Sequence, residues 1–430
     1  MKWRRIFCFL SVLVLSLGLL AFKAGASQYK SEIKVGIKYN NSDANFVSIS
    51  SSGGVNVYNA VTGDILYGAP SGEELLIKGA GAGFLSDGKF YADTVSKISV
   101  QPQNGATIFC DGAEYRGYIF LEMPASGKLT AINVLGTDDY ISSVLGKEMS
   151  YLWPKEALKA QAICARNFVL SRKAHTDYGF DVCASTHCQV YGGVKSEHQN
   201  TRQAVTETKG ILAKFNGEIV PLYFFATSSG ATEDVKNVWG SSVGYLKSVL
   251  DIYENPEIAS KYTWSMEYTR EDIENKLSAA GISIGRLKKV QIDEITPTGR
   301  VTKLTFTGDN GSYSAKLEKC RSILGLFSQK FTITPEYNSV VATTSGQASF
   351  GYRALDSSGM IKAAGTKVIS GNGAVVDIAP QNEISERYKI NGGGYGHGVG
   401  MSQWGARGMA ENGYTYDQIL KHYFTGIVLE

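Results

Sequence analysis

The sequence has almost no excess of charge of either sign. Its 430 residues include 43 Lys and Arg and 40 Asp and Glu, which gives a formal charge of +3 at pH 7. The first 26 residues contain four basic residues and no acids, so the chain that follows them carries −1. Binding to nucleic acid depends on a surplus of positive charge facing the phosphates, and we therefore expect no nucleic-acid partner.

Cysteine and proline are also scarce. Of six cysteines, one lies near the N-terminus and five remain, an odd number that argues against a full disulfide framework: Cys110, Cys164, Cys183, Cys188 and Cys320. Nine prolines stand beside 48 glycines, which indicates many turns, and we find neither an internal repeat nor a long polar tract. With 43% hydrophobic and 19% charged residues, the composition is typical of a folded globular protein.

The N-terminal segment 1–26 is typical of a targeting sequence. Basic residues precede an uncharged run from Ile6 to Phe22, and Ala24-Gly25-Ala26 follows. Seventeen apolar residues lie at the lower limit for a membrane-spanning helix, whereas the small residues fit a signal peptidase site. We expect either a cleaved signal peptide or a retained anchor, and in both cases an exported protein.

The remaining chain predicts an α+β protein. Residues 27–114 alternate apolar and polar side chains, as at Val55 and Val57, and predict a mostly β N-terminal region. We expect residues 115–430 to form a second, catalytic domain whose helical centre packs with β structure. Within it, residues from about 338 to 386 become rich in Ser, Thr, Ala and Gly and predict a β-like insertion.

One acidic residue stands out in ISSVLGKEMS, residues 141–150. On a helix, Ile141, Leu145 and Met149 would lie on one apolar stripe, and Glu148 occupies the same stripe. Either its side chain bends away to water near the helix end, or its carboxyl group is partly desolvated. Desolvation raises the pKa of a carboxyl group, and a general acid that cleaves a glycosidic bond needs such a pKa.

The next helix, opened by Pro154, carries two basic residues seven positions apart, Lys159 and Arg166. Seven residues are nearly two turns, so both project from one face. They either form a solvated helix face, or bind carboxylates of a substrate or orient Glu148.

The segment HTDYGFDVCASTHC contains four candidate metal ligands, His175, Cys183, His187 and Cys188. Thiolates and imidazoles are the ligands of tetrahedral structural Zn²⁺ sites, although this spacing is not that of a zinc finger. The alternative is a disulfide between the two cysteines, with the histidines incidental.

The C-terminal stretch has glycines at 396, 398 and 400, which in a strand would leave one face open to the close approach of a backbone or ligand. The register differs from G-x-G-x-x-G, and we expect no dinucleotide or other organic cofactor. Gly-x-Ser-x-Gly is also absent, which argues against a serine hydrolase. We expect this tail to pack near the cleft and to present polar side chains to sugar hydroxyls, with these candidates: His397, Ser402, Gln403 and Tyr423.

Several of these segments together resemble the stage II sporulation protein D (SpoIID/LytB) family. They are YRG at 115–117, the Glu148-Met149 pair, EALKAQAICAR at 156–166, SSGAT near 228 and GHGVGMSQWGARGMA at 396–410. The resemblance covers about 115–335 and 390–430.

The resemblance implies a lytic transglycosylase that cleaves peptidoglycan glycan strands stripped of stem peptides, in septal wall remodelling and engulfment during sporulation. It implies Glu148 as the catalytic residue, with Lys159 and Arg166 handling substrate, and it favours zinc at the His/Cys cluster because clostridial relatives hold zinc there. Implied partners are the glycan strands, a cell-wall amidase and membrane sporulation proteins. Other members are amidase enhancers, so a non-catalytic wall-binding protein is the alternative, and a muramidase that uses water is a third.

Overall fold

The computed structural model describes residues 31–39, 46–80, 83–86, 88–123, 129–171, 175–336, 339–343, 346–350, 366–369, 375–378 and 385–430. The N-terminal segment 1–26, and with it the prediction of a signal peptide or anchor, lies outside the described residues. Among the helices that are described, none has the length and apolar character needed to cross a membrane.

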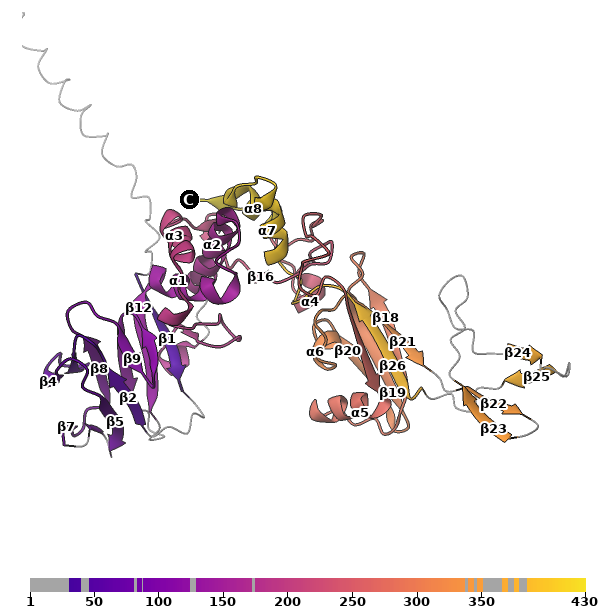
Figure 1. Ribbon diagram of the computed structural model, residues 1–430, viewed down its shortest axis with the longest axis horizontal. Helices are drawn as coiled ribbons and strands as arrows, with labels where there is room; N and C mark the ends of the chain where they lie inside the picture. Colours follow the sequence, from indigo (N-terminus) through magenta and orange to yellow (C-terminus); the bar gives the residue numbers. More distant parts are fainter. Residues whose placement is uncertain are drawn as a thin grey trace, which may run out of the picture.

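The N-terminal region is built from two β-sheets that share one core (Figure 1). Val47 and Ile49 from one sheet and Val55 and Val57 from the other are all 0% exposed, which confirms the alternation read from the sequence. The seven-stranded sheet runs β13 (Val182–Cys183), β1 (Glu32–Lys38), β12 (Thr130–Gly136), β11 (Tyr118–Glu122), β8 (Lys97–Pro102), β3 (Val55–Asn59), β4 (Ile65–Ala69). The six-stranded sheet runs β10 (Ala113–Tyr115), β9 (Ile108–Cys110), β2 (Phe46–Ser50), β5 (Leu75–Ala80), β6 (Gly83–Ser86), β7 (Phe90–Ala92).

The seven-stranded sheet extends past the boundary expected at residue 115. Its strands β11 and β12 lie between β1 and β8, and β12 leads directly into the first helix. A later segment also returns to this sheet, because β13 pairs in parallel with β1. The β region and the helical region are therefore joined through one continuous sheet.

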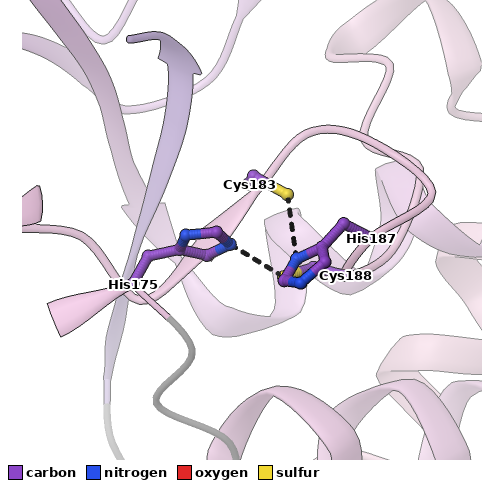
Figure 2. Close-up of side chains that lie close together, drawn as sticks. All are labelled: His175, Cys183, His187 and Cys188. Atoms are coloured by element: carbon purple, nitrogen blue, oxygen red, sulfur yellow. Dashed lines mark hydrogen bonds between the residues drawn. The ribbon is translucent and has the colours of Figure 1, made fainter. Parts of the chain in front are cut away.

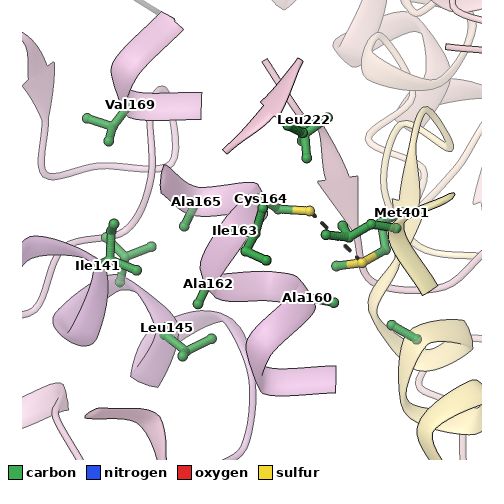
Figure 3. Close-up of a cluster of buried hydrophobic side chains, with 14 of the residues drawn as sticks. Ile141, Leu145, Ala160, Ala162, Ile163, Cys164, Ala165, Val169, Leu222 and Met401 are labelled. Atoms are coloured by element: carbon green, nitrogen blue, oxygen red, sulfur yellow. Dashed lines mark hydrogen bonds between the residues drawn. The ribbon is translucent and has the colours of Figure 1, made fainter. Parts of the chain in front are cut away.

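The helical centre is organised around α2 (Lys155–Ser171), which contacts α1, α3, α7 and α8. Figure 3 shows its buried side chains, among them Cys164, whose sulfur lies 4.0 Å from that of Met401. Burial raises the pKa of the Cys164 thiol well above its ordinary value, so this cysteine behaves as a small apolar residue. The other elements of this part are α1 (Thr137–Glu148), η1 (Thr176–Tyr178), η2 (Val194–Ser196), α3 (Gln199–Glu207), α4 (Lys236–Trp239), α7 (Gln403–Glu411), α8 (Tyr416–Tyr423), and the short strands β14 (Ala213–Phe215), β15 (Glu218–Ile219), β16 (Phe224–Phe225), β27 (Met401–Ser402) and β28 (Val428–Leu429).

A third part has a core of its own and follows the helical centre in Figure 1. It contains two three-stranded sheets, of which one is formed by β17 (Trp264–Thr269), β26 (Arg387–Gly392) and β21 (Phe331–Glu336), and the other by β18 (Leu287–Ile295), β19 (Val301–Gly308) and β20 (Gly311–Lys316), together with α5 (Arg270–Ala279) and α6 (Lys319–Ser322). β21 and β26 are neighbours in their sheet, so the predicted insertion is an excursion between two paired strands. Its described strands form two hairpins, β22 (Ser339–Thr343) with β23 (Gly346–Phe350), and β24 (Thr366–Ile369) with β25 (Val375–Ile378).

The fold is α+β with a mostly β N-terminal region, as predicted. One local expectation is wrong, because the glycines at 396, 398 and 400 do not lie in a strand. They lie in a loop and have positive φ angles of 110°, 85° and 79°. Residues other than glycine rarely adopt this backbone conformation. The expected close approach is present: a Cβ at Gly398 would lie 2.6 Å from the guanidinium carbon of Arg300.

Candidate active site

Glu148 is the last residue of α1, at the corner where the chain turns toward α2. The helix buries Ile141, Val144 and Leu145 completely, and Glu148 follows on the edge of that face with its own side chain partly buried. Burial raises the pKa of the Glu148 carboxyl, opposed by hydrogen bonds from the Gln403 side chain and the Val190 backbone. Of the two alternatives left by the sequence, the structure supports the partly desolvated carboxyl group.

The C-terminal tail reaches Glu148 through Gln403. The amide Nε2 of Gln403 donates a hydrogen bond to Oε2 of Glu148 over 3.3 Å, and Gln403 is itself 7% exposed. Gln403 is the first residue of α7, so its position is fixed by the helix rather than by a loose tail. The tail therefore packs against the acidic residue, as expected from the sequence.

Ser402 and Tyr423 have internal contacts in place of the predicted contacts with sugar hydroxyls. Both are 0% exposed. The hydroxyl of Ser402 caps α7 by accepting from the Gly405 amide at 3.2 Å, and it donates to the buried carboxylate of Glu254. Tyr423 lies in the core against α7 and next to Asp251. These side chains contact the first turn of α7 on its buried side and so help to fix its position.

His397 lies among aromatic rings. Its ring centroid is 5.2 Å from that of Trp239 and 5.6 Å from that of Phe225, and its Nδ1 accepts a hydrogen bond from the Val399 amide at 3.0 Å. Burial lowers the pKa of His397 to about 4, so the imidazole is neutral at pH 7. The hydrogen bond to Val399 holds the glycine-rich loop in shape.

The two cations of α2 are held by partners other than Glu148. Arg166 is 0% exposed, and its guanidinium donates to Asp138 Oδ1 at 3.3 Å and to the backbone carbonyl of Val205 at 3.3 Å. Lys159 pairs with Glu156 at 2.9 Å and with Glu207 at 2.8 Å. Arg166 thus joins the start of α1 to α2 and α3, a positioning task in place of the predicted contact with substrate.

The four predicted metal ligands converge on one point (Figure 2). The ligand atoms of His175, Cys183, His187 and Cys188 all lie within 4.8 Å of one another. Cys188 Sγ is 3.4 Å from His175 Nε2 and 3.5 Å from His187 Nδ1, and Cys183 Sγ is 3.9 Å from His187 Nδ1. The five described cysteines are free thiols, so the alternative disulfide between Cys183 and Cys188 is not formed.

The donor set fits Zn²⁺. With Zn–S near 2.3 Å and Zn–N near 2.0 Å, an edge between sulfur and nitrogen in a tetrahedral site is about 3.5 Å. The two separations of Cys188 Sγ, 3.4 and 3.5 Å, match this edge, and the 3.9 Å between Cys183 Sγ and His187 Nδ1 is about 0.4 Å longer. Burial alone would raise the pKa of Cys183, but hydrogen bonds from Ser185, Tyr39 and His187 outweigh it and lower that pKa to about 5. A thiolate is the form that binds a metal.

Two family models match parts of this chain. A family model described as Stage II sporulation protein, SpoIID, matches residues 125–215, the stretch that holds Glu148, α2 and the His/Cys cluster. This chain carries a SpoIID-family domain. A second model, a domain of unknown function (DUF8618), matches residues 241–351.

Curated relatives extend the similarity beyond that domain. An uncharacterized protein of Brachyspira hyodysenteriae is 29% identical over 332 residues, 77% of this chain and 75% of that protein. The amidase enhancer of Bacillus subtilis is 28% identical over 404 residues, 89% of this chain, so this chain spans about half, 53%, of that relative. Stage II sporulation protein D of Bacillus subtilis is 26% identical over 309 residues, 67% of this chain and 73% of that protein.

The helical part also holds residues that sequence reasoning did not select. Asp251 and Glu254 are buried carboxylates, and Glu254 accepts hydrogen bonds from the amides of Ser228 and Ser229 at 2.6 and 2.8 Å. Trp153 and Trp404 meet with their ring centroids 4.9 Å apart, and Trp404 follows Gln403 directly in the sequence. The rarity of tryptophan and the place of Trp404 in the C-terminal motif could have pointed to this pair. Nothing in DIYEN, residues 251–255, distinguishes its two acidic residues from surface residues.

Proposed function

We propose that this protein is a lytic transglycosylase that cleaves peptidoglycan glycan strands, with Glu148 as the single catalytic carboxyl group. The observation that carries the proposal is the partly buried Glu148, whose pKa is raised by desolvation and which is held by Gln403 at the end of α1. A raised pKa increases the share of the protonated carboxyl group at a given pH, which favours a general acid.

In the proposed reaction Glu148 acts twice, first as an acid and then as a base. Glu148 first gives its proton to the oxygen that links muramic acid to the next sugar, and the bond from C1 to that oxygen breaks through an oxocarbenium-like transition state. The C6 hydroxyl of the same muramic acid then bonds to C1, and its proton passes to the Glu148 carboxylate. Because the nucleophile belongs to the substrate, its effective concentration is high and no second carboxylate is required.

The names of the relatives support a cell-wall role in sporulation. Two are stage II sporulation proteins D from Bacillus species, and one is an amidase enhancer. We propose that the chain acts outside the cytoplasm on septal wall, either anchored by its N-terminal segment or secreted. The proposal includes a structural zinc ion held by His175, Cys183, His187 and Cys188, which would fix the segment after α2.

A second candidate function follows from the similarity to the amidase enhancer, which spans 89% of this chain. In that case the protein binds the wall and stimulates a partner amidase without cutting glycan. The two functions differ in whether purified protein alone changes the length of a glycan strand.

The test is incubation of the purified protein with glycan strands stripped of stem peptides, followed by mass spectrometry of the products. Anhydro ends support the proposal, reducing ends indicate hydrolysis by water, and intact strands leave the amidase enhancer role. Glu148→Gln should abolish cleavage and keep the fold, while the matched control Glu271→Gln, an exposed residue of α5, should cleave as the parent does. Cleavage by Glu148→Gln at the parental rate would exclude Glu148 as the acid.

A further inference from the structure

Two tryptophans from distant parts of the sequence meet between the corner that follows Glu148 and the start of α7. Trp153 ends the turn between α1 and α2, and Trp404 is the second residue of α7. Their ring centroids lie 4.9 Å apart with the planes tilted by 57°, and both side chains are partly exposed. Trp153 also packs against the helical core, but core packing does not account for the part of each ring that stays exposed.

A third side chain holds the pair. The guanidinium carbon of Arg407 lies 4.9 Å from the centroid of Trp404 and 5.5 Å from that of Trp153, within the range of cation–π attraction. Glu411 accepts from Arg407 Nε at 2.7 Å and fixes the guanidinium in turn. Rings that are already fixed lose little conformational entropy when a ligand settles on them.

The position of the pair relates it to the acid. Trp404 directly follows Gln403, whose amide donates to Glu148, so its Cα is about 3.8 Å from that of a residue in contact with the carboxyl group. Trp153 lies five residues after Glu148, where its amide closes a turn by donating to the Ser150 carbonyl at 3.0 Å. The two rings therefore come from the same two segments of the chain as the hydrogen-bonded pair of Glu148 and Gln403.

We propose that Trp153 and Trp404 form a stacking platform for one sugar ring of an N-acetylated glycan, the subsite adjoining the bond that Glu148 protonates. A pyranose ring presents aliphatic C–H groups on its faces and hydroxyl groups at its rim. The C–H groups carry slight positive charge and fit the negative face of an indole, while the burial of the ring face adds hydrophobic stabilisation.

The platform supplies what the acid alone lacks. The raised pKa of Glu148 is of use only when the linking oxygen of the glycan is held within hydrogen-bond reach of the carboxyl group. The face of one indole fixes the plane and height of the sugar, and the second indole, tilted by 57°, borders the sugar at one side. This inference rests on the proposed function only for the identity of the glycan.

The experiment measures binding separately from cleavage. The Glu148→Gln protein, which should leave the glycan uncut, is titrated calorimetrically with purified disaccharide-repeat glycan oligomers that lack stem peptides. Trp404→Ala should weaken binding on the order of tenfold, by analogy with the loss of one stacked ring, whereas Trp404→Phe should keep most of it. The matched control is Tyr91→Ala, an exposed aromatic of β7 in the N-terminal region, which should bind as the parent does.

Each result decides the proposal. Equal binding by a folded Trp404→Ala protein, or no binding of glycan by the parent, overturns it. If Trp404→Ala does not fold, as judged by its thermal melt, Trp153→Ala and Trp404→Phe carry the comparison. If glycan binding depends on the tryptophans but wild type never cleaves glycan, the platform stands and the transglycosylase is refuted. If wild type cleaves glycan but the tryptophan variants bind it as the parent does, the transglycosylase stands and the platform is refuted.

Discussion

The hydrogen bond from the Gln403 side chain helps to set the pKa of the Glu148 carboxyl group. Gln403 donates to the ionised form of Glu148 and so lowers a pKa that burial raises. Gln403→Leu removes that donor, and the pKa of Glu148 should rise further. Because the first step needs the protonated acid, the alkaline limb of the pH profile of strand cleavage should move to higher pH. A limb that stays in place, or moves to lower pH, would show that Gln403 does not set this pKa.

Arg166 is the charged residue whose loss should cost most stability. It is 0% exposed and satisfies Asp138 and a backbone carbonyl, which would both lose a donor in Arg166→Ala. Breaking a buried charge pair typically costs about 3–5 kcal/mol, so the urea midpoint should fall strongly. Lys421→Ala, which removes an exposed pair with Asp417 on α8, should cost only about 0.3–0.5 kcal/mol. Similar losses in the two variants would contradict the role given to Arg166.

At the scale of elements, the position of α7 depends on a close contact with the loop that contains Asp251. A Cβ at Gly405 would overlap the carboxylate of Asp251 and the hydroxyl of Tyr423. Gly405→Ala should therefore destabilise the fold by about 1–3 kcal/mol through overpacking, and displace Gln403 from Glu148. Gly68→Ala on β4, where the added carbon would lie 3.4 Å from the side-chain oxygen of Asn56, should be close to neutral in the same urea titration. Equal stability of Gly405→Ala and wild type would mean that α7 tolerates the shift.

The same loop makes stability depend on pH. Burial and the charge of Glu254 raise the pKa of Asp251 from 3.8 to about 7. Between about pH 4 and pH 7 the folded protein therefore holds a proton that the unfolded chain has lost, so stability falls as pH rises through this window and stays low above it. Asp251→Asn should flatten this part of the profile of melting temperature against pH. An unchanged slope would show that Asp251 is not the titrating group.

At the scale of the whole molecule, the His/Cys cluster lies where the helical part returns to the N-terminal sheet. Cys183 ends β13, which pairs with β1, while His187 and Cys188 lie in the loop that follows. If the cluster holds zinc, elemental analysis should find about one ion per chain in wild type and in Cys110→Ala, and far less in Cys183→Ser. Chelation should then lower the melting temperature of wild type and of Cys110→Ala and leave that of Cys183→Ser unchanged. Equal metal content in the three proteins would rule out this ligand set.

The local features of this protein could be predicted from its sequence. The stripe of Ile141 and Leu145 places Glu148 against the core, because residues four apart lie on one helix face whatever the rest of the chain does. The capping box at Thr415 and Gln418 starts α8, and both partners lie within one turn. The His/Cys cluster lies within fourteen residues, so a single stretch of chain is able to gather it.

The arrangement around the acid was decided only by the tertiary structure. Gln403 meets Glu148 across 255 residues, and Trp404 meets Trp153 across a similar separation. Arg166 and Tyr423 look like surface or tail residues in the sequence, yet the packing of α1, α3 and α7 on α2 buries both. Periodicity reports which side of its own element a residue occupies, whereas the neighbour on that side depends on how the whole chain closes. The sequence therefore determined that Glu148 faces inward, and the fold determined what surrounds it.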